Sequence, residues 1–116
     1  MASNALNIAE SHSGEVCVVA LAGRIDSTNA EQLMTRLTNL LSSGQKAVVV
    51  DFADVIYLTS AAFRALLVAT DQAERNTARF VLCSVLGQVR DLFEMGGLLD
   101  AFTIHGTREE ALTRLA

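Results

Sequence analysis

The feature that most constrains this chain is a repeated change in the spacing of its apolar residues. Short apolar runs rich in β-branched residues are typical of strands, and they occur at 15–21, 46–52, 79–83 and 101–105. Apolar residues that recur three and four positions apart predict helices, at 27–41, 60–74, 85–93 and 107–115. A further strand at 6–11 can join the first one through a hairpin at Ser13 and Gly14.

Strands that alternate with helices in this way indicate an α/β fold. We predict one domain over residues 1–116, with a largely parallel or mixed central sheet and about four helices packed on it. Hydrophobic residues make up 51% of the 116 positions, which is enough to bury a core without disulfides or metals. Open α/β folds place their binding sites where strands lead into helices, so the candidate stretches are 23–26, 51–60 and 84–88.

Charge and hydropathy narrow the classes of function. The formal net charge is −4 and the basic residues are scattered, whereas a nucleic-acid-binding surface needs clustered Lys and Arg. No apolar run approaches the roughly 20 residues that cross a bilayer, so we expect no membrane insertion. The first residues show neither the basic nor the apolar part of a signal peptide. We therefore expect a cytoplasmic protein that binds no nucleic acid.

The residue types that carry catalysis or bind metals do not occur in recognisable patterns. The sequence has no glycine-rich phosphate loop and no GxSxG nucleophile motif. Cys17 and Cys83 lie within predicted strands, where a free cysteine acts as a small apolar residue. His12 and His105 fall near strand ends with no second ligand at metal-binding spacing. We expect no enzymatic activity, no cofactor and no metal.

Three acidic residues leave two interpretations open. Asp26 follows the first long apolar strand, Asp51 ends the second, and Asp54 sits in the turn predicted after it. Carboxylates of this kind can converge at the edge of a sheet and hold Mg²⁺. An arrangement of solvated turn residues explains them at least as well.

The most informative segment is 48–63. Its buried strand ends at Asp51, a short turn follows, and Thr59 and Ser60 then open a helix. Hydroxyl residues at a helix N-terminus normally cap the free amides there, and this explains Thr59. A second hydroxyl directly after the cap is less needed structurally, and it lies where the amides and the helix dipole favour an anion.

With these motifs the chain resembles the STAS family (sulphate transporter and anti-sigma factor antagonist domains), most closely the free-standing bacterial anti-sigma factor antagonists. The stretch 23–26, Gly-Arg-Ile-Asp, is similar to the family's Gly-x-Leu/Ile-Asp after an early strand. The stretch 59–62, Thr-Ser-Ala-Ala, stands at the place of the family's Asp-Ser-Ser-Gly. There Ala62 replaces a glycine that gives a partner close access to the backbone. The likeness extends over nearly the whole chain, which implies a single STAS-like domain.

In that family a kinase that also acts as the anti-sigma factor phosphorylates the serine directly after the motif's Asp, and the unmodified antagonist binds this kinase and frees the sigma factor. The resemblance implies that Ser60 is the phosphoacceptor and that the chain, a monomer or weak homodimer, regulates sigma-factor-dependent transcription. The residues expected to bind the partner are Asp26, Thr59, Ser60, Ala61 and Arg64. STAS domains that are never phosphorylated offer an alternative: a scaffold in a stress-signalling complex, or a subunit associated with lipid or anion transport. Thr59 and Ser60 would then serve only as a helix cap.

Overall fold

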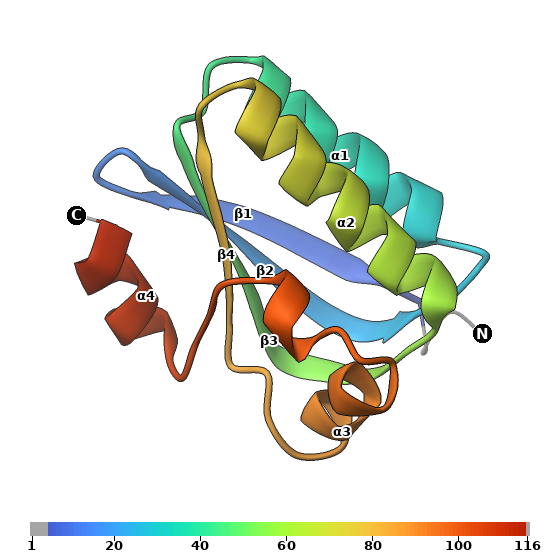
Figure 1. Cartoon of the computed structure of the whole chain (residues 1–116). Helices are drawn as coiled ribbons and strands as arrows, with labels where there is room; N and C mark the ends of the chain where they lie inside the picture. The colour runs from blue at the N-terminus through green and yellow to red at the C-terminus, as the bar shows by residue number, and fades with distance from the viewer. Residues whose placement is uncertain (1–4, 116) are drawn as a thin grey trace.

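The computed structural model of the chain describes residues 5–115. Within this range five strands form one sheet in the order β1-β2-β3-β4-β5, accompanied by four α-helices and a short 3-10 turn, η1 (Figure 1). The strands are β1 (Asn7–Ser13), β2 (Val16–Ile25), β3 (Ala47–Leu58), β4 (Arg79–Cys83) and β5 (Ile104–His105). The helical elements are α1 (Ala30–Ser42), α2 (Ser60–Arg75), α3 (Gly87–Met95), η1 (Leu99–Ala101) and α4 (Arg108–Leu115). β1 runs antiparallel to β2 and the other neighbouring strands are parallel, so the predicted mixed α/β fold is confirmed.

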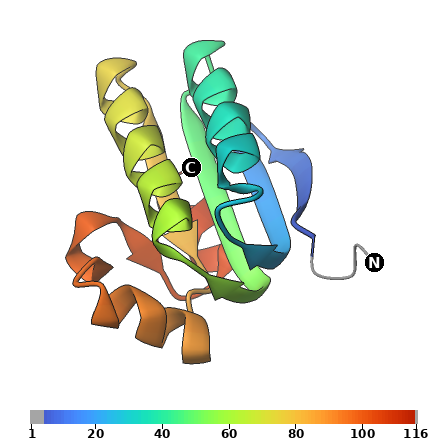
Figure 2. The ribbon, with the colours of Figure 1, turned by 90° about the vertical axis from the view of Figure 1, so that its right-hand side faces the viewer.

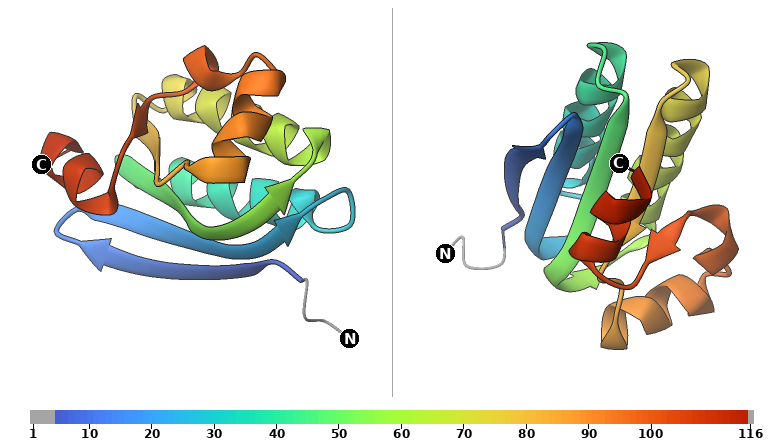
Figure 3. Two further views of the ribbon diagram at one scale, coloured as in Figure 1. Left: turned by 90° about the horizontal axis from the view of Figure 1, so that it is seen from below. Right: turned by 90° about the vertical axis from the view of Figure 1, so that its left-hand side faces the viewer.

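The sheet separates two apolar layers of unequal size. α1 and α2 lie side by side over one face (Figure 2), and α4 lies against the other face (Figure 3). Side chains alternate between the two faces along each strand. Cys17 of β2 points into the larger layer, and Cys83 of β4 points into the smaller one. Both cysteines are buried, as predicted. No helix in residues 5–115 is long and apolar enough to span a bilayer.

Phe93 of α3 holds one end of the sheet against the start of α2. Its side chain is fully buried, and its ring meets Phe52, Phe63 and Phe102 edge to face, with ring centroids 5.8, 4.9 and 5.8 Å apart. Aromatic pairs in this geometry each contribute about 0.5–1.5 kcal/mol beyond the area that they bury. The contacts join β3, the first turn of α2 and the segment after η1. They therefore hold the first turn of α2 in place against the end of the sheet.

β3 differs from the prediction, which ended this strand near Asp51 and followed it with a turn. The strand is continuous over Ala47–Leu58. Ala20 of β2 pairs with Asp51 whereas Ala22 pairs with Asp54, so β3 carries one extra residue at this point. Such a bulge twists and bends a strand without ending it. The polar residues that resembled a turn therefore belong to a bulged strand.

Gly23 marks a second irregularity, two residues beyond the predicted end of β2 at Leu21. It has a φ of +101°, and a Cβ at this position would collide with the backbone oxygen of Ala5. Only glycine tolerates both this conformation and this close approach. β2 continues past Gly23 to Ile25, which pairs with Leu58 at the end of β3. The loop after β2 and the single residue that links β3 to α2 consequently start side by side.

Candidate functional site

The two motif-bearing stretches meet at the carboxyl ends of β2 and β3. The amide of Thr59 donates a hydrogen bond to the backbone oxygen of Ile25, at 3.0 Å. This bond fixes the start of α2 beside the loop that leads from β2 into α1. Ser60, the first residue of α2, is exposed. The structure thus brings Ser60 and Asp26 to the same edge of the sheet.

Thr59 has the backbone of a helix cap but does not form the capping bond. Its φ and ψ are −111° and 179°, the extended conformation usual at this position. Its hydroxyl makes no capping bond with α2 and instead lies 3.4 Å from the backbone oxygen of Ile25, to which it donates. The predicted capping role of this hydroxyl is therefore wrong. Because the first turn of α2 also holds no acidic residue, the positive end of the helix is left open to an anion.

Asp26 anchors the loop between β2 and α1. Its carboxylate accepts hydrogen bonds from the amide of Thr28, at 2.9 Å, and from the Thr28 hydroxyl. The Asn29 side chain accepts from the Asp26 amide and donates to the backbone oxygen of Arg24, both at 2.9 Å. The hydrogen bonds from the Thr28 hydroxyl and then from its amide lower the pKa of Asp26, so this carboxyl is charged at neutral pH. Among residues 5–115 its hydrogen bonds go to Thr28 and not to Ser60.

A groove of about 350 Å³ opens between the first turns of α1 and α2. Ser60, Ala61 and Arg64 line it from α2. The opposite wall comes from α1 and the loop before it: Ser27, Ala30, Glu31 and Met34. Asp26 and Thr59 lie next to lining residues along the chain but outside the lining itself. The structure therefore brings together three of the five residues expected to bind a partner, with the other two adjacent.

Glu31 and Met34 are groove residues that the sequence reasoning missed. Helical spacing identifies Met34 only as part of the apolar face of α1, and Glu31 only as an acid in its first turn. Both face Ser60 because α1 packs against α2. No local pattern in the sequence reports that packing.

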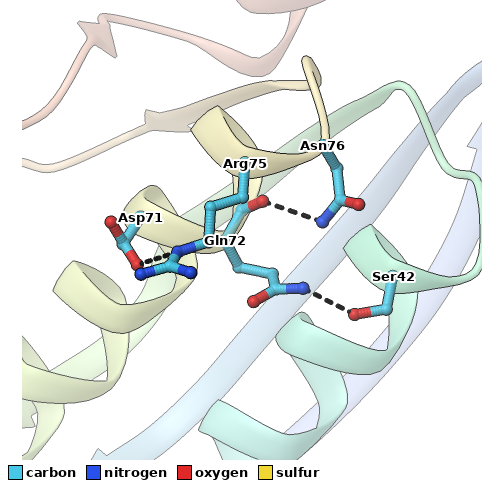
Figure 4. A network of polar contacts seen from close by, with 5 residues as sticks. All are labelled: Ser42, Asp71, Gln72, Arg75 and Asn76. Carbon is cyan, nitrogen blue, oxygen red and sulfur yellow. Dashed lines mark hydrogen bonds and ion pairs between the residues drawn. The ribbon is translucent and has the colours of Figure 1, made fainter.

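The opposite ends of α1 and α2 are tied together by polar contacts (Figure 4). The side-chain amide of Gln72 donates to the hydroxyl of Ser42 at 2.8 Å, which links the two helices. Asn76 donates to the backbone oxygen of Gln72 at 2.9 Å, and Arg75 pairs with Asp71 at 2.8 Å. The bond between Gln72 and Ser42 thus joins the helices near their carboxyl ends, the other two contacts stay within α2 and its C-cap, and the groove lies at the amino ends.

Asp51 is not a solvated turn residue, because it is only 5% exposed and lies under α4. Its carboxylate accepts from the Ala53 amide at 2.9 Å and pairs with Nε of Arg108 at 2.8 Å. Burial raises the pKa of Asp51, but the hydrogen bonds from the Ala53 amide and from Arg108 outweigh it, so the pKa lies below its ordinary value. Asp54 is exposed on β3, and no group of three or more potential metal ligands is assembled within residues 5–115. The acidic residues therefore do not converge in the described part of the chain.

Comparison with known proteins identifies the family of this fold. The family model described as "STAS domain" matches residues 7–111. A relative from Bordetella bronchiseptica that carries the name of an anti-sigma factor antagonist, BtrV, is 34% identical over 94 residues, which cover 81% of each chain. The crystal structure of an anti-sigma factor antagonist from Mycobacterium paratuberculosis matches with a TM-score of 0.86 at 22% identity, over 97% of this chain and 95% of that one. The phosphorylated form of SpoIIAA from Bacillus matches with a TM-score of 0.73 at 20% identity, over 95% and 100% of the two chains. The chain therefore belongs to the STAS domain family.

Proposed function

We propose that this STAS domain is an anti-sigma factor antagonist with no enzymatic activity of its own. It binds, in the cytoplasm, an anti-sigma factor that is also a serine kinase. Phosphorylation of Ser60 ends this binding and so controls sigma-factor-dependent transcription. The observation that carries the proposal is the exposed Ser60 at the open N-terminus of α2, on the wall of the groove between α1 and α2. The name of the Bordetella relative supports it.

Phosphorylation transfers the terminal phosphoryl group of ATP from the kinase to Ser60. The hydroxyl oxygen of Ser60 attacks the γ-phosphorus, the bond from that phosphorus to ADP breaks, ADP leaves, and the hydroxyl proton passes to the kinase. The product carries about −1.5 to −2 charges at neutral pH. The N-terminus of α2 favours an anion, and Thr59 places no capping bond there that the phosphate must replace. We therefore expect the fold to change little.

The switch then acts at the interface with the partner. Ser60 and Glu31 line facing walls of one groove, so a phosphate enters a site that is already partly acidic. Repulsion from Glu31 acts on the free and the bound protein alike, so the loss of affinity comes from an acidic group of the partner that the phosphate meets in the interface. Two unit charges ~6 Å apart repel by about 2.8 kcal/mol at an effective dielectric of roughly 20. Because each ~1.4 kcal/mol is tenfold in affinity, this corresponds to roughly a hundredfold loss of binding.

The departures from the family motif leave room for a partner. Ala62 replaces the motif's glycine, but its side chain is fully buried in the core under α2, so its methyl group does not narrow the groove. Ala61 replaces the second serine and gives the groove a small apolar wall. Thr59 replaces the Asp and removes one negative charge beside Ser60. These three positions are compatible with phosphorylation at Ser60.

The proposal is tested by incubating the protein with the candidate anti-sigma kinase and ATP, followed by mass spectrometry of the peptide that contains Ser60. We expect phosphate on Ser60, and none on Ser60→Ala, which should stay folded and keep its partner. Ser27→Ala is the matched control because Ser27 is an exposed hydroxyl on the same groove, and this variant should be phosphorylated like the wild type. Phosphate on a different residue, or none with an active kinase, contradicts the proposal and favours a scaffold or transport-associated role.

A further inference from the structure

Arg64 stands one helical turn after Ser60 on the same side of α2. Both residues are exposed, and both line the groove between α1 and α2. Residues four apart on a helix have Cβ atoms about 5–6 Å apart, and helical side chains lean toward the N-terminus of their helix. The guanidinium of Arg64 can therefore reach back over the first turn of α2, where Ser60 lies.

Arg64 is available for such a contact. Three other arginines form ion pairs with carboxylates, and Arg24 stacks on the ring of Tyr57, 4.8 Å from its centroid. Among residues 5–115, Arg64 has neither an ion-pair partner nor an aromatic one. Glu31 lies on the facing wall of the groove. A phosphate on Ser60 would thus have a cation on its own helix and an anion across the groove.

We propose, on the basis of the function proposed above, that Arg64 is the positioning residue for phosphorylated Ser60. Its guanidinium binds the phosphate within the same chain, in the two-pronged geometry that arginine forms with phosphate. Glu31 repels the phosphate and so favours the Arg64 side of the groove. In the unmodified protein Arg64 meets an acidic group of the partner. Phosphorylation thus adds an anion at Ser60 and also withdraws the Arg64 cation from the interface.

The test uses protein in which phosphoserine is encoded at position 60 during translation, so it does not depend on any kinase. The ³¹P resonance, followed from about pH 4 to about pH 9, gives the second pKa of the phosphate. A cation about 5 Å away in water favours the dianion, so Arg64→Gln should raise this pKa by about half a pH unit. Glu31→Gln should lower the pKa because it removes a like charge. Arg90→Gln, the same change at an exposed residue of α3, should leave it unaltered.

An unaltered phosphate pKa in Arg64→Gln, or a change no larger than that in Arg90→Gln, overturns the inference. The proposed function would survive that result, because the charge on Ser60 alone can still weaken partner binding. Conversely, if no kinase modifies Ser60, the proposed function fails while the encoded phosphoserine still reports on Arg64. Arg64→Lys keeps the charge without the planar fork and should retain part of the pKa shift. Circular dichroism of each variant confirms that it is folded.

Partner binding supplies a second readout. With the anti-sigma factor, Arg64→Gln should weaken binding of the unmodified protein and thereby narrow the affinity ratio between the unmodified and phosphorylated forms. A ratio equal to that of the wild type contradicts the withdrawal of Arg64 from the interface. Arg90→Gln again serves as the control for the loss of one positive charge.

Discussion

Removing Arg108 should destabilise the protein because it leaves a buried carboxylate unpaired. Arg108 lies 2.8 Å from the carboxylate of Asp51, a residue that is 5% exposed. Breaking a buried ion pair by removing one partner costs about 3–5 kcal/mol. The Arg108 side chain is 39% exposed, so solvent partly screens this pair. We therefore expect Arg108→Gln to lower the free energy of unfolding by about 2 kcal/mol at neutral pH.

The loss of unfolding free energy in Arg108→Gln should depend on pH, and the protonation of Asp51 decides whether it grows or shrinks as the pH falls. In the wild type the pKa of Asp51 lies below its ordinary value. The ion pair therefore stabilises the fold above about pH 4 and is lost as the pH falls through the pKa of the folded state. Arg108→Gln removes the guanidinium that partly offsets the burial of Asp51, so the pKa of Asp51 rises. Relative to the wild type, the variant should regain stability as the pH falls from about 7 to about 5.

Urea denaturation near pH 7 and near pH 5 measures both quantities. With a slope of roughly 1–3 kcal/mol per molar, a loss of ~2 kcal/mol moves the midpoint by about 1 M. Arg75→Gln is the matched control, since Arg75 pairs with Asp71 at the same 2.8 Å but with side chains 73% and 62% exposed. It should cost less than about 0.5 kcal/mol at either pH. Equal losses in the two variants, or an Arg108→Gln loss that does not shrink toward pH 5, would refute the reasoning.

Three further substitutions test the site and the strand and helix ends that position it. Gly23→Ala should cost at least about 2 kcal/mol, because it places a Cβ against the Ala5 backbone at positive φ; an unchanged melting temperature contradicts this. Thr59→Ala should cost less than the ~1 kcal/mol of a lost cap, because its hydroxyl forms no capping bond. A larger loss in urea denaturation would show that the hydroxyl caps α2 in solution. Asp26→Asn should alter partner affinity or phosphorylation and lower the melting temperature only slightly, because the amide oxygen of Asn can still accept the hydrogen bonds from Thr28; a large drop with normal binding would mean that anchoring the loop is the only role of Asp26.

The helices and strands were predictable where each carries its own periodic signal. The change from β-branched runs to helical spacing located α1, α2 and the hydrogen-bonded core of the sheet. One error concerns β2 and β3, which continue beyond their predicted ends. There Gly23 and the acidic residues at 51–54 resemble a turn locally, and only the pairing between the two strands keeps them extended. Another concerns the strand predicted at 101–105, because Ala101 belongs to η1 and only Ile104 and His105 pair as β5.

The candidate site was predictable only in part. Local pattern placed Ser60 at the first residue of a helix, and this position is confirmed, whereas its role stays a prediction. The capping rule failed at Thr59 because its hydroxyl donates a hydrogen bond to the backbone oxygen of Ile25, in the neighbouring strand. Glu31 joins the groove only through the packing of α1 on α2. Asp51 and Arg108 are 57 residues apart, a separation that no local pattern bridges.

The affinity of the anti-sigma factor for the protein with and without phosphate on Ser60 tests the central claim most directly. Isothermal titration calorimetry on the unmodified protein and on protein with encoded phosphoserine gives both dissociation constants at one salt concentration. We predict that the phosphate weakens binding by roughly a hundredfold, while Ser60→Ala binds like the unmodified wild type. Equal affinities of the phosphorylated and unmodified proteins for this partner would contradict a switch at Ser60.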